Sequence, residues 1–568
     1  MPKAFALLPA LLAIAVCSAA AAAQSPGPPP EAPSGKVVLV LPFDNHSGDA
    51  SLNWIGDSIP DTLNQRLSSA GFLTISHDDR VFAYEHLGLP ADFRPTRATT
   101  IRIAQRLDAN YVILGSYDVQ SDAASTAAAG AAKAPTDRRI SIEARVLSID
   151  QLRLGAPMDE SDALMSLFKA ENSIAWKVAE VLDPQLSVSE QTFLAAPGAV
   201  PLPAFEDYIR GINASTDAEK LARLKDAVAL QPGYAAALLE LGKEQYAQRD
   251  FDAAAATLAK VPESKRIALE ANFYLGLAEF NSANYARAQT AFAFVASRMP
   301  LPEVVNNEAV AISRQGKDGV ALFQKASSMD PSDEDYHYNL AIAMFRQGDT
   351  AGAESQVQNA LRLKPDDQEA QELASELKKA APGTRLTEDV GSSAESQAAP
   401  GEGDSGFSPL ERIGREYSEA GFRQAEFQLD QMRAIRMAML PPDKQAVEYT
   451  RAGREYLSEG LLPEAEKQFQ SALSANPNSA EAHAGMAQLR EASGDDAKAR
   501  DEARTSLILK PNSTALLVLA RLDMAQKQLA ACAKDIAQAL QLDPTDPQAI
   551  ALKLVLQQRG QPVPPAQP

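Results

Sequence analysis

The sequence predicts an α/β amino-terminal domain followed by an all-α superhelix of repeated helical hairpins in two arrays. The first observation is a β-branched and aliphatic run over residues 37–41, which opens a stretch of alternating strand and helix patterns. The second is a regular sequence period that begins near Ala204, where the strand patterns end. The third is the length of 568 residues, which exceeds one compact core and suits a repeat array.

The net charge argues against two classes of partner. The chain has 74 acidic and 54 basic side chains, a formal net charge of -20. A charge of this sign repels nucleic acid and anionic lipid head groups. We therefore expect no nucleic-acid partner, and a membrane contact that is only indirect or made through an uncleaved signal.

Residues 1–23 have the order of a secretory signal peptide. Lys3 precedes an apolar run from Ala4 to Val16, and small residues continue up to Ala23. This order predicts cleavage after Ala23 and a periplasmic or secreted mature protein. The alternative is a membrane anchor formed by residues 4–23, because apolar or small residues continue through this range.

Two segments follow the signal. Residues 24–35 hold five prolines and cannot bury a core, so they predict an extended tether. Residues 36–190 predict the α/β domain, which begins with a strand covered on both faces at residues 37–41. The later elements are expected as a helix over 54–67, a strand over 72–75, a helix over 99–107, strands over 111–117 and 140–149, and a helix over 162–182.

Landmark residues recur with a fixed period after Ala204. The spacing from Pro331 to Pro365 is 34 (365 − 331), and the spacing from Pro477 to Pro511 is the same (511 − 477). The fullest copy has its small, aromatic and proline landmarks at Tyr449, Gly453, Tyr456, Ala465, Phe469, Ala472 and Pro477. This pattern resembles the tetratricopeptide-repeat family, whose units are antiparallel helical hairpins with a period of about 34 residues.

The repeats divide into two blocks. Residues 204–379 predict the first array and residues 409–560 the second. Residues 380–408 are rich in glycine, serine, alanine and acids, a composition that predicts a disordered linker. Residues 561–568 are expected to form a disordered tail.

The first domain resembles a recurrent bacterial domain, similar to the amino-terminal domain of the periplasmic protein TolB. The residues that carry the resemblance are Val38 to Leu41, Pro42, Phe43, Asn45, Ser47 to Asp49, Gly56, Asp57, Ile103, Ala104, Leu107, Asn110 to Val112, Leu114 to Ser116, Leu167 and Phe168. The resemblance implies a mixed sheet with helices on its faces and an envelope or regulatory role. It implies no catalytic residue.

No pattern predicts an enzyme, and we expect no catalytic residue, no cofactor and no metal site. A glycine-rich match at residues 401–406 lies in the polar linker, where it neither follows a strand nor opens a helix. The remaining metal candidates are His77, Asp78, Asp79, Glu85 and His86, which could converge if a turn lay between them. Unpaired surface polar residues are the alternative interpretation.

The repeats offer a better site. By resemblance, the first helices of successive repeats line a concave face that carries Leu239, Tyr246, Phe273, Phe280, Tyr338 and Phe345. Aromatic side chains on such a face suit an extended or helical peptide. The alternative is that they pack between neighbouring helices. In the second array the corresponding face is polar and includes Arg454.

These observations favour an exported protein-protein interaction scaffold or assembly adaptor of the bacterial envelope, with other proteins or peptides as partners. The alternative is a ligand-sensing regulatory protein, in which the α/β domain binds a small molecule and the repeats relay the signal to a partner. That alternative requires a pocket with converging polar groups.

Overall fold

The computed structural model describes residues 36–90, 93–121, 138–195, 200–263, 267–386, 408–415, 417 and 419–564. The expected signal peptide, the tether and the glycine-rich match lie outside these residues, as do most of the expected linker and the end of the tail. Among the described residues, no helix has the length and apolarity needed to cross a membrane.

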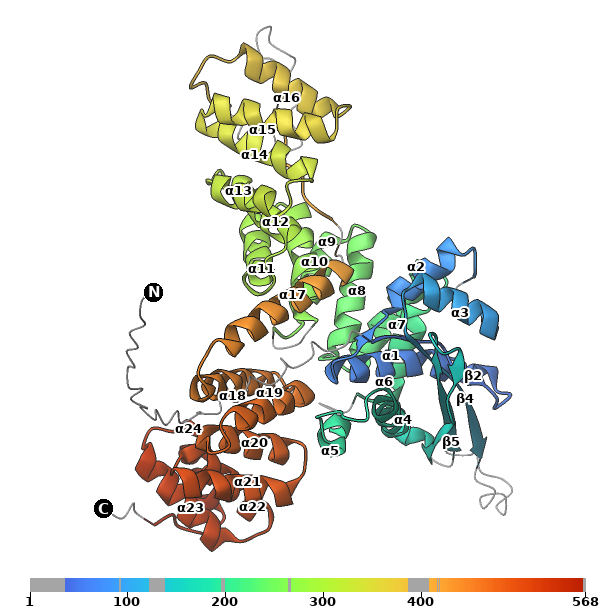
Figure 1. The fold of residues 1–568 in the computed structure, drawn as a ribbon, viewed down its shortest axis with the longest axis vertical. Coiled ribbons are helices and arrows are strands. Elements are labelled where there is room, and N and C mark those ends of the chain that lie inside the picture. The colour runs from blue at the N-terminus through green and yellow to red at the C-terminus, as the bar shows by residue number, and fades with distance from the viewer. Residues whose placement is uncertain are drawn as a thin grey trace, which may run out of the picture. The chain divides into compact units, whose positions relative to one another are not determined.

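The amino-terminal domain contains one mixed sheet (Figure 1). The main strand order is β3-β1-β4-β5-β6, with β2 beside β4 and β7 beside β5. The strands β1, β3 and β4 are parallel, and β5 runs antiparallel to β4, β6 and β7. The strands are β1 (Val37–Val40), β2 (Asp44–Asn45), β3 (Leu73–Thr74), β4 (Tyr111–Ser121), β5 (Arg138–Ser148), β6 (Arg153–Leu154) and β7 (Met158–Ala163).

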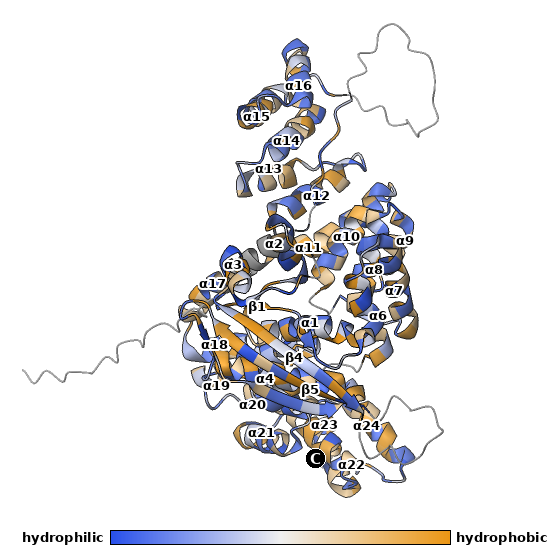
Figure 2. Cartoon of the chain, turned by 90° about the vertical axis from the view of Figure 1, so that its right-hand side faces the viewer, coloured by the Kyte–Doolittle hydropathy of each residue, from blue (hydrophilic) through white to orange (hydrophobic). Residues whose placement is uncertain are grey.

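Strand β1 is buried on both faces, as its unbroken apolar sequence predicts. Val38 and Val40 pack in one cluster with α1 and α4, while Leu39 and Leu41 pack in another with α2 and α3. The strand is drawn in the hydrophobic colour in Figure 2. These helices are α1 (Trp54–Ser69), α2 (His77–His86), α3 (Arg97–Arg106) and α4 (Leu167–Leu182).

The carboxyl-terminal part of the sheet differs from the expected pattern. The helix expected over 162–182 begins only at Leu167, and Met158–Ala163 instead forms β7. This strand consists mostly of acidic and small residues, so it lacks the apolar alternation by which strands are recognised. Its position comes from pairing with β5, which sequence periodicity alone does not reveal.

The first array comprises successive antiparallel helix pairs. Its helices are α6 (Leu202–Ile212), α7 (Asp217–Leu230), α8 (Ala235–Ala247), α9 (Phe251–Leu258), α10 (Ala268–Asn281), α11 (Tyr285–Arg298), α12 (Pro302–Ser313), α13 (Val320–Met329), α14 (Glu334–Gln347), α15 (Thr350–Leu363) and α16 (Gln368–Lys379). The short helix α5 (Glu190–Leu194) precedes them.

The second array repeats the same unit after a long helix. That helix is α17 (Glu419–Ala438), and the array consists of α18 (Pro442–Ser458), α19 (Leu462–Ala475), α20 (Ala480–Ala492), α21 (Asp496–Leu509), α22 (Ser513–Ala525), α23 (Leu529–Leu542) and α24 (Pro547–Gln558). The sequence places the start of this array at residue 409, but residues 408–415 form no helix. Its first hairpin is α18 and α19.

Glycines let the paired helices approach closely. A Cβ atom at Gly276 would lie 2.6 Å from the Phe292 ring, and one at Gly453 would lie 2.7 Å from Phe469. The Phe469 ring also fills the space where a Cβ at Gly485 of the next hairpin would stand. Phe469 therefore packs both within its own repeat and against the following one.

Candidate functional site

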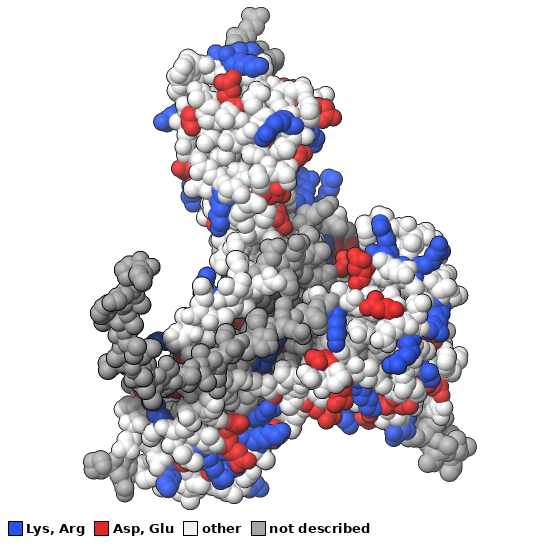
Figure 3. All heavy atoms as spheres, in the orientation of Figure 1, with Lys and Arg blue, Asp and Glu red and all other residues white. Residues whose placement is uncertain are grey.

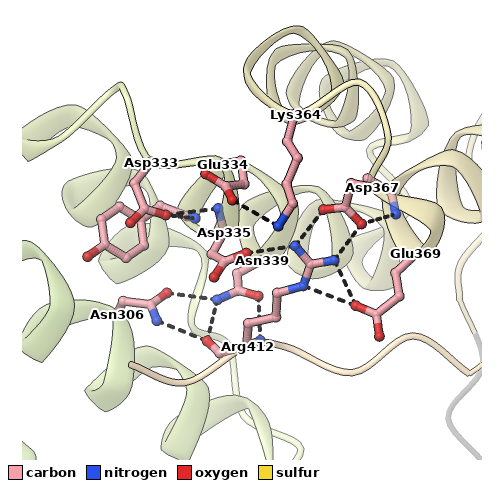
Figure 4. Close-up of polar contacts among 11 residues, drawn as sticks. Asn306, Asp333, Glu334, Asp335, Asn339, Lys364, Asp367, Glu369 and Arg412 are labelled. Atoms are coloured by element: carbon pink, nitrogen blue, oxygen red, sulfur yellow. Dashed lines mark hydrogen bonds and ion pairs between the residues drawn. The ribbon is translucent and has the colours of Figure 1, made fainter. Parts of the chain in front are cut away.

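A stretch of extended chain, residues 408–415, lies across the first array. It contacts the first helices of consecutive hairpins: α12 and α14 through asparagine side chains, and α16 through acidic side chains. Figure 4 shows Arg412 of this stretch surrounded by residues from these helices. We call residues 408–415 and 417 the groove segment, and the helix faces that it contacts the groove.

Two buried asparagines bind the main chain of Arg412. Asn339 accepts a hydrogen bond from the Arg412 N–H at 2.7 Å and donates to its carbonyl oxygen at 2.7 Å. Asn306 donates to the same carbonyl oxygen at 3.0 Å and accepts from Asn339 at 2.9 Å. The Asn339 amide thus pairs with one residue of the segment as a neighbouring β-strand would.

A third asparagine repeats this arrangement two residues further along. Asn307 accepts from the Gly414 N–H at 2.8 Å and donates to the Gly414 carbonyl oxygen at 2.8 Å. Asn306, Asn307 and Asn339 are all buried. Buried amides need hydrogen-bond partners, and these three asparagines find theirs in the main chain of the segment rather than in its side chains.

The Arg412 side chain enters an acidic pocket (Figure 4). Its guanidinium donates to Asp335 at 2.6 Å, to both oxygens of Asp367 at 2.7 and 2.8 Å, and to Glu369 at 2.7 Å. Its Cζ atom lies 4.0 Å from the centroid of the Tyr338 ring. Burial opposes the charge, but hydrogen bonds to Asp367, Asp335 and Glu369 raise the pKa of Arg412 overall. The hydrogen bond from Arg412 in turn lowers the pKa of Asp367.

The preceding residue, Glu411, enters a basic pocket. Its fully buried carboxylate accepts hydrogen bonds from Ser313 and Arg346 and lies 3.4 Å from Arg314 Nε. Arg314 also donates to the Glu411 carbonyl oxygen at 3.3 Å. Over the face drawn in Figure 3, acidic and basic side chains are interspersed. The groove, by contrast, separates them into two adjacent pockets of opposite sign.

The far end of the segment contacts aromatic residues of α10. The Tyr417 ring lies edge-on to Phe273, with centroids 5.6 Å apart, and stacks on Phe422 of α17 at 4.2 Å. Phe422 is itself buried in the cluster that contains Phe273. The segment is thus fixed by main-chain bonds, two ion-pair pockets and an aromatic contact.

The structure places the sequence-predicted residues in different surroundings. Tyr338 and Phe273 contact the groove segment, while Leu239 and Phe345 lie in clusters between helices. Tyr246 packs against Phe251 and Tyr274, and Phe280 packs against Tyr285. In the second array, Arg454 Nη2 lies 3.4 Å from the Glu481 carbonyl oxygen.

Sequence reasoning missed the asparagines, although they leave a periodic signal. The spacing from Asn306 to Asn339 is 33 (339 − 306), and the spacing from Asn272 to Asn306 is 34 (306 − 272). Asn306 and Asn339 thus lie about one repeat apart, whereas Asn272 is not at the position of Asn339, because it precedes Pro300 by 28 residues and Asn339 precedes Pro365 by only 26 (300 − 272 and 365 − 339). Asn272 donates only within its own helix, to the Ala268 carbonyl oxygen. Periodic asparagine on a groove face indicates main-chain recognition, because an amide offers both a donor and an acceptor.

The second array also holds another part of the chain. Arg490 donates to Glu466 at 2.5 Å and to the Ser189 hydroxyl at 2.6 Å, just before α5. The Glu466 carboxylate accepts from the Ser189 N–H at 3.1 Å, and Gln470 donates to the Ser187 carbonyl oxygen at 2.7 Å. Side chains, most of them charged, make this contact.

The histidine cluster considered for a metal lies on one helix. His77, Asp78 and Asp79 are in the first turn of α2 and Glu85 and His86 in its last, so no turn brings the two sets together. Burial, with the nearby Arg80, lowers the pKa of His77 to about 4. Among the described residues, no cluster of His, Cys, Asp or Glu has the arrangement of a metal site.

A polar hollow of about 460 Å³ lies in the α/β domain, with His46 among its lining residues. The other lining residues include Asp118, Glu143, Asp159 and Glu160. Such a lining favours a cation over an anion.

The helical hairpins, their regular sequence period and the groove along the first helices define a tetratricopeptide-type solenoid. Two family models described as tetratricopeptide repeat match residues 313–377 and 450–514. The chain therefore contains tetratricopeptide repeats, and these repeats support a protein-interaction scaffold.

Similar proteins were found by sequence and by structure. A putative adenylate cyclase 3 of Rhizobium meliloti (strain 1021) is 25% identical over 218 residues, which are 37% of this chain and 32% of that protein. The match thus spans about a third of the relative's length. MamA from Desulfovibrio magneticus RS-1 is 18% identical over 30% of this chain and 99% of its own, with a TM-score of 0.28. YrrB, described as a TPR protein with an unusual peptide-binding site, is 15% identical over 36% of this chain and 98% of its own, also with a TM-score of 0.28.

Proposed function

We propose that this protein is a noncatalytic scaffold that binds partner proteins through extended peptide segments, and that the groove of the first array is its binding site. The observation that carries the proposal is the set of paired hydrogen bonds from Asn339 and Asn307 to the main chain of Arg412 and Gly414. Main-chain bonds give affinity for an extended strand, and side-chain pockets beside them give selectivity.

A peptide selection tests this function. In the full-length chain with Glu411→Ala and Arg412→Ala, the groove segment loses both ion-pair contacts and competes less for the groove. A random library of ten-residue peptides is then displayed against this variant. We expect enriched peptides whose binding falls when Asn306→Ala and Asn339→Ala are added, and does not fall with Asn272→Ala. The proposal is rejected if no peptide is enriched, or if the enriched peptides bind equally well without both asparagines.

The cellular setting is part of the proposal. The order of residues 1–23 and the resemblance of the α/β domain to that of TolB favour an exported envelope scaffold. The alternative, anchoring by residues 4–23, keeps the scaffold at the membrane. Intact-mass measurement on exported protein separates the two, because cleavage after Ala23 leaves Gln24 as the first residue.

A ligand-sensing α/β domain is the second candidate function. It is favoured by the polar hollow beside His46, whose acidic lining suits a small organic cation. Calorimetry of the full chain with a set of polyamines and basic amino acids tests this, with Glu143→Gln and Glu160→Gln as lining variants. Absence of any heat of binding would reject it.

A further inference from the structure

The groove is occupied by the protein's own chain. Asn306, Asn307 and Asn339 are buried, and the hydrogen bonds that they make outside their own helices go to residues 412 and 414 or to one another. The segment that satisfies them follows α16 by about thirty residues in the sequence and belongs to neither helical array. A groove of this kind accepts a second chain only after this one leaves.

The two charged pockets of the groove follow a fixed order along the bound chain, the basic pocket first and the acidic pocket second. The carboxylate of Glu411 meets Ser313, Arg314 and Arg346, whereas the guanidinium of the next residue meets Asp335, Asp367 and Glu369. Exchanging the two charges would place a carboxylate among three carboxylates and a guanidinium between two others. Glu411 and Asp367 are buried, whereas the Asp335 and Glu369 side chains are 43% and 64% exposed. Like charges oppose binding most strongly at the buried groups, so the pockets around Glu411 and Asp367 select the order acid-then-base.

The residue two positions after Arg412 adds a main-chain contact. Gly414 offers both its N–H and its carbonyl group to Asn307, and a Cβ atom there would stand 3.5 Å from Asn307 Oδ1 and 3.6 Å from the Glu303 Cβ. These are ordinary contact distances, so the groove accommodates a side chain at this point as well as glycine. The selectivity of the groove therefore rests on the positions of Glu411 and Arg412.

We propose that residues 408–415 are an internal ligand that closes the groove, and that the partner is a protein presenting an extended Glu-Arg segment that displaces it. This inference rests on the proposed function, because it requires the groove to bind peptides. Tethered ligands act at effective concentrations on the order of millimolar. A partner thus needs either high affinity or a second contact elsewhere on the scaffold.

The test uses the full-length chain and two labelled synthetic peptides. One has the sequence of residues 408–417, Ser-Pro-Leu-Glu-Arg-Ile-Gly-Arg-Glu-Tyr, and the other exchanges its first Glu with the Arg that follows. Fluorescence anisotropy measures their binding to the wild type and to the Glu411→Ala, Arg412→Ala variant. We expect the native peptide to bind the variant at least tenfold more tightly than it binds the wild type, and at least tenfold more tightly than the exchanged peptide binds the variant.

Each other outcome has a distinct meaning. Equal binding of both peptides to the variant overturns the Glu-Arg signature but leaves the peptide-binding function standing. Equal binding of the native peptide to the wild type and the variant overturns closure by the internal ligand. Failure of both peptides to bind the variant overturns the proposed function itself. If circular dichroism shows lost helix in the double variant, Arg412→Gln alone, which leaves Glu411 in its pocket, serves in the same comparison.

Discussion

The two arrays are built from the same repeat, yet they hold other parts of the chain by different means. In the first array, asparagine amides bind the main chain of an extended segment. In the second, Arg490 and Glu466 bind mainly the side chain and N–H of Ser189, beside the folded helix α5. The repeat thus fixes the scaffold, and a few side chains on it decide what kind of segment is held.

The positions of the asparagines explain the difference. The spacing from Asn339 to Pro365, the proline that follows its hairpin, is 26 (365 − 339). The same spacing before Pro477 and Pro511 leads to Arg451 and Gly485 (477 − 451 and 511 − 485). Neither residue offers both a donor and an acceptor in its side chain. At Gly485 the Phe469 ring fills the space, so the packing of the second array leaves no room for an amide there.

The contact of the groove segment with the first array therefore suits replacement by another segment. The contact of α5 with the second array suits a permanent attachment. An extended segment held by its main chain can be replaced by another extended segment without loss of those bonds. The contact with α5 depends on particular side chains, among them a buried ion pair. We expect the second array to keep α5 in place while the first array changes its ligand.

The largest effect is expected for Arg490→Ala. Its removal leaves the buried Glu466 carboxylate unpaired, which costs about 3–5 kcal/mol in comparable buried pairs. Hydrogen exchange of the amides of residues 187–195 should accelerate about a hundredfold or more, while those of residues 408–415 stay unchanged. The control is Arg500→Ala, which breaks the comparably buried pair with Asp523 in the same array without touching α5. Equal acceleration of both segments would mean that the two contacts are not independent.

The next largest effect is a pH dependence of the stability of the α/β domain, which precedes α5. Glu171 is fully buried and accepts hydrogen bonds from Ser58 and Thr62, each at 2.6 Å. Burial raises its pKa from 4.5 to about 7, although the two hydroxyls work against this. Between these values the folded state keeps a proton that the unfolded state has lost, so the free energy of unfolding should fall by about 3 kcal/mol as the pH rises from 4.5 to 7 and then level off.

Thermal melts of Glu171→Gln across this pH range check the prediction. The variant should show a flatter dependence of the melting temperature on pH, while Glu143→Gln, a change of the same charge at a half-buried residue, should not. Hydrogen exchange of the α5 amides in the wild type could follow the same pH dependence as the melting temperature. In that case α5 would be released by unfolding of the α/β domain rather than by loss of the Arg490 contact.

A smaller effect is expected for Asn339→Ala. The variant loses the paired bonds to Arg412 and leaves the Arg412 N–H without its acceptor, which costs about 1–3 kcal/mol. The amides of residues 412 and 414 should exchange roughly ten- to a hundredfold faster, with no change at α5. Asn272→Ala is the control, because it removes an asparagine of α10 that bonds only within its own helix. A segment that stays protected in Asn339→Ala would show that the ion-pair pockets alone hold it.

The sequence predicted the repeats because their landmarks pack locally. Gly453 and Phe469 belong to one hairpin, so their spacing is visible within a single repeat. The strand at residues 37–41 was visible for a similar reason, since burial on both faces requires an unbroken apolar run.

The groove segment was not predictable in this way. Its bonds join residues that lie far apart in the sequence, such as Asn339 with Arg412 and Asn307 with Gly414, and they use main-chain atoms that are the same in every sequence. Its residues show neither helical nor strand periodicity, so the sequence assigned them partly to the linker and partly to the second array. Phe273 and Tyr338 were among the residues expected on the concave face, with interhelical packing as the alternative, but the asparagines beside them were not.

The smallest effect is expected at Tyr338. This residue both packs between helices and contacts the groove segment, which were the two alternatives for the aromatic side chains of the first array. The ring is buried among residues of α14 and α15, and its face also supports the Arg412 guanidinium. Tyr338→Leu keeps an apolar side chain for the interhelical packing but removes the ring face, and a cation–π contact to a partly exposed arginine contributes about 1 kcal/mol. The native peptide should therefore bind the Glu411→Ala, Arg412→Ala variant about fivefold more weakly when Tyr338→Leu is added, with a change of melting temperature no larger than that of Phe345→Leu. Phe345 is the matched control because it lies two turns later on the same helix, in the same cluster and away from Arg412. If both substitutions weakened peptide binding equally, Tyr338 would act only through the packing of the array, and recognition of the arginine would rest on Asp335, Asp367 and Glu369 alone.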